Sequence, residues 1–247
     1  MPIKKRPLLF GQILLILLLF WIALFFAWQT LSAVHFFYPI IYDALDIGAV
    51  IQQYGPLNVY KSDFEQTARA QHIQLFSEIV NAINQSGQGL AQIVYYDRHG
   101  QEVDTLLRVP EVVHLQDVAN LLDSLRTASY WIILAWLLGV LFFKVKQWLL
   151  ERIGYSILWV LGGLIGVATV VVLYDAQAIF YALHTMVFPE GNQWFFYYQE
   201  SLMTTLMKAP DIFAVMAALL VSVAFFYFVL MLWLMNKYLG LERRVEQ

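Results

Sequence analysis

Long apolar runs alternate with polar stretches along the 247-residue chain. No charged residue occurs between Pro7 and Tyr42, and three further apolar runs follow. A helix needs about 20 apolar residues to cross the hydrocarbon core of a bilayer. The first run is too long for the apolar core of a signal peptide and shows no clear cleavage site, so we expect it to remain as a span. We therefore predict four transmembrane helices, at residues 8–34, 127–148, 153–174 and 212–236.

The composition agrees with a membrane protein. Hydrophobic residues make up 60% of the chain and charged residues 13%, against about 45–50% and 25% in soluble domains. This excludes a disordered chain, a nucleic-acid binder and an ordinary cytosolic enzyme. The chain has no cysteine, which excludes disulfides, thiolate metal ligands and a cysteine nucleophile on this chain.

The charged residues are sorted between the two sides that four spans define. One side has the N-terminus, the loop between the second and third spans, and the tail 237–247; it holds nine basic and three acidic residues, a net charge of +6. The other side holds six basic and fifteen acidic residues, a net charge of −9. Because basic residues concentrate on the cytoplasmic side of membrane proteins, we expect both termini in the cytoplasm. Residues 35–126 and 175–211 then face outward.

The first outward segment, residues 35–126, predicts a small α+β domain between the first two spans. A capping box that begins at Ser62 predicts a helix to about Asn84. His72 lies on the apolar stripe of this helix, where a packed core histidine is the expected role. Apolar runs on both sides of a turn predict a β-hairpin within residues 90–109.

A further helix of this domain begins at Pro110. Glu111, His114 and Asp117 follow at intervals of three residues and share one face of it. A carboxylate at this spacing can fix the tautomer of an imidazole and raise its basicity. The alternative is a solvated helix face without a functional role, in which such pairs contribute a few tenths of a kcal/mol.

The second outward segment, residues 175–211, predicts interfacial helices. Its first helix covers residues 175–188 and places His184 among apolar residues, where a histidine is costly unless it has a partner. The alternative is an interfacial histidine that reaches lipid headgroups. The aromatic-rich stretch Trp194–Lys208 is typical of a helix lying on the membrane.

Two of the histidines are the candidates for chemistry. The sequence has no metalloprotease, phosphate-loop or dinucleotide-binding motif. His114 and His184 both lie in the outward segments, and two imidazoles can serve as base and acid in acyl transfer without a covalent intermediate. They could instead hold a copper or zinc ion. The protein could also be a non-enzymatic membrane subunit whose outward domain binds a partner.

The residues around these histidines resemble one known family, the lipoprotein intramolecular transacylases (Lit type). The four-span layout with one large outward domain is similar as well, so the resemblance covers nearly the whole chain. The matching blocks are His114-Leu-Gln-Asp117-Val118, which fits an H-x-x-D-V motif, and His184-Thr-Met-Val-Phe188 followed by Trp194 and Pro210-Asp-Ile-Phe213.

The resemblance implies a reaction and a site. The sn-2 acyl chain of a diacylglyceryl-modified lipoprotein would move to the α-amine of its own N-terminal cysteine, which yields a lyso-form lipoprotein. His184 would be the base and His114, steered by Asp117, the acid, or the two roles would be exchanged. The expected substrate-binding residues are Glu111, Phe188, Asn192 and Trp194.

The resemblance also implies the surroundings of the protein. We expect neither a cofactor nor a bound metal. The expected partners are diacylated lipoproteins and membrane lipids, with no nucleic acid and no obligate protein partner. The expected location is the bacterial cytoplasmic membrane, with the active site on the extracytoplasmic side.

Overall fold

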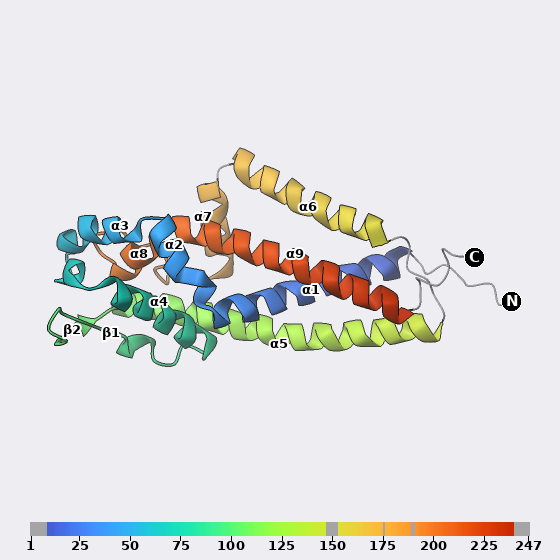
Figure 1. Ribbon diagram of the computed structural model, residues 1–247, viewed down its shortest axis with the longest axis horizontal. Helices are drawn as coiled ribbons and strands as arrows, with labels where there is room; N and C mark the ends of the chain where they lie inside the picture. The colour runs from blue at the N-terminus through green and yellow to red at the C-terminus, as the bar shows by residue number, and fades with distance from the viewer. Residues whose placement is uncertain (1–8, 147–152, 175, 189–190, 240–247) are drawn as a thin grey trace. The chain divides into compact units, whose positions relative to one another are not determined.

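A computed structural model describes residues 9–146, 153–174, 176–188 and 191–239 (Figure 1). Most of the tail 237–247 lies outside the described residues. Some of the charged residues counted above also lie outside them: Lys4, Lys5, Arg6, Glu151, Arg152, Asp175, Glu190, Glu242, Arg243, Arg244 and Glu246. The helices are α1 (Leu9–Ala33), α2 (Tyr38–Ala44), α3 (Ile47–Tyr54), α4 (Arg69–Asn84), α5 (Val109–Val145), α6 (Ile153–Tyr174), α7 (Ala176–Val187), α8 (Leu202–Met207) and α9 (Asp211–Leu239). The strands are β1 (Val94–Tyr96) and β2 (Glu102–Thr105), and 3₁₀ turns occur at His35–Phe37, Gly55–Leu57, Phe64–Gln66 and Leu90–Gln92.

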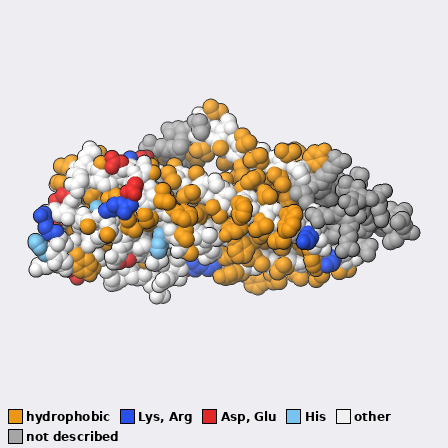
Figure 2. All heavy atoms as spheres, in the orientation of Figure 1, with side chains coloured by type: hydrophobic (Ala, Val, Ile, Leu, Met, Phe, Trp, Pro, Cys, Tyr) orange, Lys and Arg blue, Asp and Glu red, His pale blue; other side chains and the backbone are white. Residues whose placement is uncertain are grey.

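Four of the described helices are long and apolar enough to cross a membrane. Their candidate spans are Phe10–Ala33 in α1, Val109–Val145 in α5, Gly154–Val171 in α6 and Asp211–Leu239 in α9. Figure 2 shows hydrophobic side chains gathered over the long helices, as expected for surfaces that face lipid. The prediction of four membrane-spanning helices is confirmed, and the protein is a multi-pass membrane protein.

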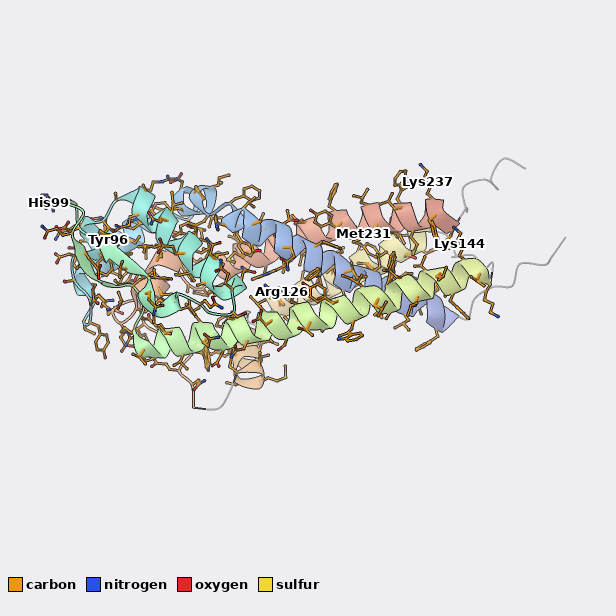
Figure 3. The ribbon with its side chains drawn as sticks, turned by 90° about the horizontal axis from the view of Figure 1, so that it is seen from below. Tyr96, His99, Arg126, Lys144, Met231 and Lys237 are labelled. Carbon is orange, nitrogen blue, oxygen red and sulfur yellow. The ribbon has the colours of Figure 1, made fainter. Side chains whose placement is uncertain are left out.

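Helix α5 is continuous over 37 residues, whereas the sequence divided this segment between an outward domain and the second span. At 1.5 Å per residue it is about 55 Å long, well beyond the roughly 30 Å of a hydrocarbon core. Apart from Lys144 in its last turn, its charged residues lie at or before Arg126, part-way along the helix (Figure 3). Residues 127–145 therefore account for the span, and the polar N-terminal part lies outside it.

The chain divides into two compact units. The helix unit comprises the described residues of Met1–Trp28, Arg126–Leu183 and Val221–Gln247, and the mixed unit comprises those of Gln29–Leu125 and His184–Leu220. In the helix unit, Trp21 of α1 donates from Nε1 to Oγ of Ser129 in α5 at 3.0 Å. The rings of Phe20 in α1 and Phe228 in α9 lie 5.8 Å apart. These contacts join α1 to both neighbouring helices.

The mixed unit has an aromatic and aliphatic core to which α2, α3, α4 and α8 contribute. The rings of Tyr38 and Phe76 stack with centroids 3.8 Å apart, and Oη of Tyr38 donates to the carbonyl oxygen of Leu206 at 2.6 Å. Helix α3 also packs against α8. The domain predicted at residues 35–126 is thus only part of this unit, because α8 from the second outward segment completes its core.

His72 of α4 is 3% exposed, which confirms the expected core histidine. Oη of Tyr42 lies 2.8 Å from its Nδ1, and Oγ1 of Thr67 lies 2.6 Å from its Nε2. Because the Thr67 hydroxyl donates to the carbonyl oxygen of Phe64 at 2.6 Å, its oxygen accepts from the ring, which assigns the ring proton to Nε2. Tyr42 then donates to Nδ1. Burial lowers the pKa of His72 to about 4, so the ring is neutral at pH 7.

Two predicted helices differ from the structure. The prediction that a capping box at Ser62 begins a helix is wrong. Asp63 takes a left-handed conformation (φ 63°) before a short 3₁₀ turn, and α4 begins only at Arg69. The surface helix predicted over residues 194–208 is also wrong. Its first part is irregular, and α8, which starts after the N-cap residue Ser201, is buried throughout rather than lying on a surface. The helix predicted at residues 175–188 is confirmed as α7.

The predicted β-hairpin is confirmed, with shorter strands. Strand β1 pairs antiparallel with β2. In the turn, Oδ1 of Asp97 accepts from the backbone N–H groups of His99 and Gln101 at 2.8 and 2.9 Å, and Gly100 supplies a φ of 75°, which glycine adopts without strain. His99 is exposed at this turn (Figure 3).

Candidate functional site

Polar residues occur at every third position where α5 begins: Arg108, Glu111, His114 and Asp117. Residues three apart lie on one helix face. Glu111 is completely buried, and its Oε2 accepts a hydrogen bond from the backbone N–H of Arg108, which satisfies a free donor at the start of the helix. His114 is 9% exposed. The solvated-face alternative is therefore wrong for Glu111 and His114.

An irregular stretch, residues 191–201, contacts this face and is called the covering segment below. Gly191 begins it with a φ of 95°, a conformation that favours glycine. These tertiary contacts explain why the aromatic stretch does not form the predicted surface helix. The contacting pairs are Asn192 with Asp117, Phe196 with both His114 and Arg108, and Ser201 with Glu111.

The two candidate histidines lie close together in the mixed unit. The ring centroids of His114 and His184 are 6.3 Å apart. Phe188 contacts both rings, at 5.1 Å from His114 and 5.3 Å from His184, and Trp194 lies 4.8 Å from His184. The described residues contain no group of three or more His, Cys, Asp or Glu side chains placed to hold a metal ion. The arrangement brings two imidazoles together among aromatic rings.

His114 is neutral at pH 7. Its pKa is lowered to about 4, first by burial and then by the neighbouring His184, while the charge of Asp117 acts in the opposite direction. Asp117 thus acts on His114 through its charge, and the hydrogen bond that the structure gives its carboxylate comes from Asn192, at 2.7 Å. Nδ1 of His114 is buried and has no hydrogen-bond partner among the described residues. Such a nitrogen can take up a proton from a bound molecule.

Glu111 and Arg108 form the end of this face. Burial raises the pKa of the Glu111 carboxyl, although the neighbouring Ser201 side chain and the hydrogen bond from the Arg108 backbone oppose the effect. Nε of Arg108 lies 3.6 Å from Oε2 of Glu111. Sequence reasoning missed Arg108, although it stands three residues before Glu111 and continues the same spacing. It also missed Phe196 and Ser201, whose contacts are distant in sequence and leave no local signal.

Fold and site together define a multi-pass membrane protein in which two histidines lie close together among aromatic side chains. The model of one protein family, described as "Lipoprotein intramolecular transacylase Lit", matches residues 12–213. This match covers most of the chain and includes every residue of the candidate site. The chain belongs to this family, and a transacylase is an acyltransferase.

Solved structures share the fold. The chain is similar to the membrane integral lipoprotein intramolecular transacylase Lit from Bacillus cereus, with a TM-score of 0.67 and 13% identity over 96% of this chain and 97% of that chain. A variant of that protein with a histidine-to-alanine mutation gives a TM-score of 0.66 at 12% identity, over 96% and 94%. A histidine-to-arginine variant gives 0.61 at 13%, over 96% and 95%. No match was found among curated proteins.

Proposed function

We propose that this protein transfers the sn-2 acyl chain of a diacylglyceryl-modified lipoprotein to the α-amine of the N-terminal cysteine in the same molecule. The product is a lyso-form lipoprotein. The observation that carries the proposal is the 6.3 Å separation of the His114 and His184 rings among aromatic side chains. Membership of the transacylase family supports the same reaction class.

The two histidines divide the proton transfers of this reaction. The amine nitrogen bonds to the ester carbonyl carbon, and the same carbon then releases the sn-2 glyceryl oxygen. The neutral amine gives up one proton and the departing oxygen gains one, so the two transfers balance. His184 takes the proton of the amine and passes it to the neighbouring His114, and His114 then delivers it to the departing oxygen, so both rings end as they began. Because His114 is neutral at pH 7, the proton that it delivers is the one that it has received from His184.

Residues around the histidines hold the amine and the ester together. Phe188 and Trp194 contact the glyceryl and acyl groups, while Asn192 and Glu111 supply polar contacts near the reacting atoms. Intramolecular reactions between well-oriented groups reach effective molarities of about 10⁵ M or more, so alignment of this kind supplies much of the rate. The carboxylate of Asp117 keeps the imidazole of His114 more basic than burial alone would leave it.

The site faces away from the cytoplasm in this proposal. The sorted charges of the sequence, +6 on one side of the spans and −9 on the other, favour a cytoplasmic location for both termini. The mixed unit then lies on the extracytoplasmic side of a bacterial cytoplasmic membrane. Its substrates are diacylated lipoproteins of that membrane, and the reaction needs no cofactor.

Expression in a bacterium that lacks this activity tests the proposal. Mass spectrometry of lipoprotein N-terminal peptides should show the acyl chain on the cysteine amine. His184→Ala and His114→Ala should each lower conversion by about 10²- to 10⁴-fold, the usual contribution of a general acid or base. His99→Ala is the matched control, because His99 is exposed in the hairpin turn. The proposal fails if the parent moves no acyl chain, or if both alanine variants convert as well as the parent.

A further inference from the structure

Buried polar atoms without a hydrogen-bond partner gather at one place in the described chain. Four of the seven such atoms belong to the start of α5: Nε and Nη2 of Arg108, Oε1 of Glu111 and Nδ1 of His114. An unsatisfied buried polar group costs free energy and is rare in folded proteins. A cluster of them on one helix face therefore indicates a place where polar atoms of another molecule bind.

Arg108 is the cation of this cluster. Its Cζ lies 4.5 Å from the ring centroid of Tyr60 and 5.6 Å from that of Phe196, so its guanidinium group contacts two aromatic rings. Its side chain is 15% exposed, and its ion pair with Oε2 of Glu111 is long, at 3.6 Å. That carboxyl oxygen already accepts from the Arg108 backbone. Glu111 thus orients the guanidinium without satisfying its Nε and Nη2 donors.

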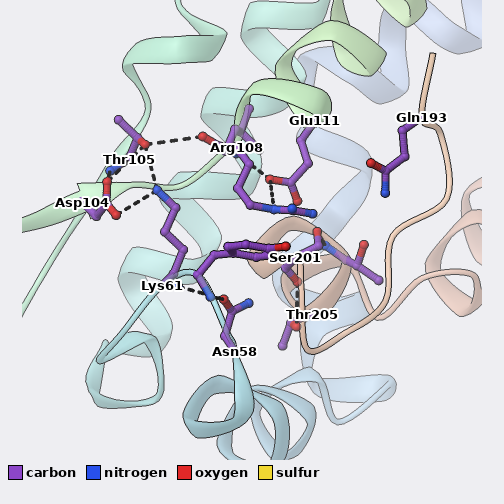
Figure 4. Close-up of polar contacts among 12 residues, drawn as sticks. Asn58, Lys61, Asp104, Thr105, Arg108, Glu111, Gln193, Ser201 and Thr205 are labelled. Atoms are coloured by element: carbon purple, nitrogen blue, oxygen red, sulfur yellow. Dashed lines mark hydrogen bonds and ion pairs between the residues drawn. The ribbon is translucent and has the colours of Figure 1, made fainter. Parts of the chain in front are cut away.

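A second basic residue nearby, Lys61, differs from Arg108 in its side-chain partners. Lys61 has two side-chain partners: its Nζ lies 2.9 Å from Oδ2 of Asp104 and donates to Oγ1 of Thr105 at 3.1 Å (Figure 4). Its contacts join the segment after α3 to strand β2. Lys61 therefore has a structural role, whereas the guanidinium of Arg108 keeps donors that the described residues do not use.

The chemistry of Arg108 defines what it can bind. A guanidinium has five N–H donors and no acceptor, so its ligand must present an acceptor oxygen. Glu111 already balances much of the charge of Arg108, and Asp117 on the same face would repel an anion. A neutral carbonyl oxygen therefore suits the site better than a phosphate. Phe196 touches both Arg108 and His114, which brings this site next to the proposed chemistry.

We propose that the guanidinium of Arg108, held by Glu111, binds a carbonyl oxygen of the lipoprotein substrate, and that the ring of Tyr60 covers it until the substrate arrives. The inference rests on the proposed function. Tyr60 is 59% exposed and belongs to an irregular segment after the Gly55–Leu57 turn, so its ring can move away. The carbonyl belongs either to the N-terminal cysteine or to an ester of the diacylglyceryl group.

Two synthetic substrates distinguish the cysteine carbonyl from an ester carbonyl as the group that Arg108 binds. One is a short peptide with an N-terminal diacylglyceryl cysteine, and the other is diacylglyceryl cysteamine, which has the amine and the esters but no cysteine carbonyl. With the purified full-length protein, Arg108→Met should lower kcat/KM for the peptide by about 10- to 100-fold, the effect of losing a charged hydrogen bond. Binding of the cysteine carbonyl predicts no further loss on the cysteamine compound, whereas binding of an ester carbonyl predicts the same loss on both.

Lys61→Met and Tyr60→Ala are the comparison variants. Lys61→Met removes a structural ion pair and should lower thermal stability without a comparable loss of kcat/KM. Tyr60→Ala should lower KM, because it removes the ring that competes with the substrate, and this test stays valid if Arg108→Met does not fold. The inference is overturned if Arg108→Met keeps the parental kcat/KM, if Lys61→Met loses as much, or if the KM of Tyr60→Ala does not fall. A parent that converts neither substrate contradicts the proposed function instead.

Discussion

Asn192 donates a hydrogen bond from its Nδ2 to Oδ2 of Asp117 over 2.7 Å, which ties the covering segment to α5 one turn beyond His114. Trp194 follows Asn192 by two residues and lies against His184. A single side-chain contact therefore helps to set the position of an aromatic ring relative to both histidines. Because positioning supplies much of the rate of an intramolecular reaction, this contact should influence turnover more than stability.

Asn192→Ala tests this relationship. We expect kcat to fall by about tenfold, because the covering segment loses its tie to Asp117, while the free energy of unfolding changes by about 1 kcal/mol or less, as for one partly exposed hydrogen bond. Gln193→Ala is the control, because its side chain donates to the nearby carbonyl oxygen of Phe195 in the same segment. Equal kcat values for the two variants would refute the positioning role of Asn192.

Asp117→Asn should change the titration of His114. The charge of Asp117 raises the pKa of this imidazole against the larger effect of burial. Loss of the charge of Asp117 should lower the titration midpoint of His114 below the parental pKa of about 4. Nitrogen-15 NMR of the histidine-labelled protein can follow it, with His114→Ala identifying the signal. Asp123→Asn, a charge change further along the same helix, serves as the comparison, and an unchanged or higher midpoint in Asp117→Asn would contradict the effect.

The sequence predicts those features that residues close together in the chain determine. Charge-free runs predict the four spans because a bilayer core excludes unpaired charge. Asp97 and Gly100 predict the hairpin because each satisfies a need of the turn itself. The spacing of Glu111, His114 and Asp117 places them on one helix face, and the structure agrees. The assignment of acid and base to His114 and His184 stays a prediction.

Other features depend on contacts between distant segments, and no local pattern reveals them. Aromatic density over residues 194–198 is the same for a helix on a membrane surface and for a segment whose rings contact buried histidines. The sequence identifies Ser201 as a possible N-cap residue, but it gives no sign that Ser201 lies beside Glu111. Helix α8 is buried in contact with Tyr38, a residue far away in the chain. Tertiary packing therefore decided these elements against the local preference.

The burial of α8 can be tested at its hydrogen bond with Tyr38. Tyr38→Phe removes the hydroxyl that donates to the carbonyl oxygen of Leu206 and leaves that oxygen short of a partner in the core. We expect a loss of about 1–3 kcal/mol in the free energy of unfolding, measured by thermal unfolding of the detergent-solubilised protein. Tyr96→Phe is the control, because Tyr96 is 38% exposed. An unchanged melting temperature in Tyr38→Phe would show that the bond does not contribute.

His72 should make the mixed unit sensitive to acid. Its pKa is about 4 in the folded protein because of burial, against about 6.5 in an unfolded chain. The unfolded chain therefore binds a proton between these values and the folded protein does not. The contribution to stability is complete above pH 6.5 and is lost as the pH falls toward 4, by up to about 3 kcal/mol.

Thermal unfolding at pH 7 and pH 5 measures this effect. The parent should melt at a clearly lower temperature at pH 5. His72→Gln keeps polar atoms in place but does not titrate. It should therefore be less stable than the parent at pH 7, but its melting temperature should fall less between pH 7 and pH 5. His114, whose pKa is also about 4, contributes in the same direction, and the double variant His72→Gln/His114→Gln should lose still less. His99→Ala should show the same change in melting temperature between pH 7 and pH 5 as the parent. If His72→Gln shows the parental change as well, His72 does not cause the sensitivity to acid.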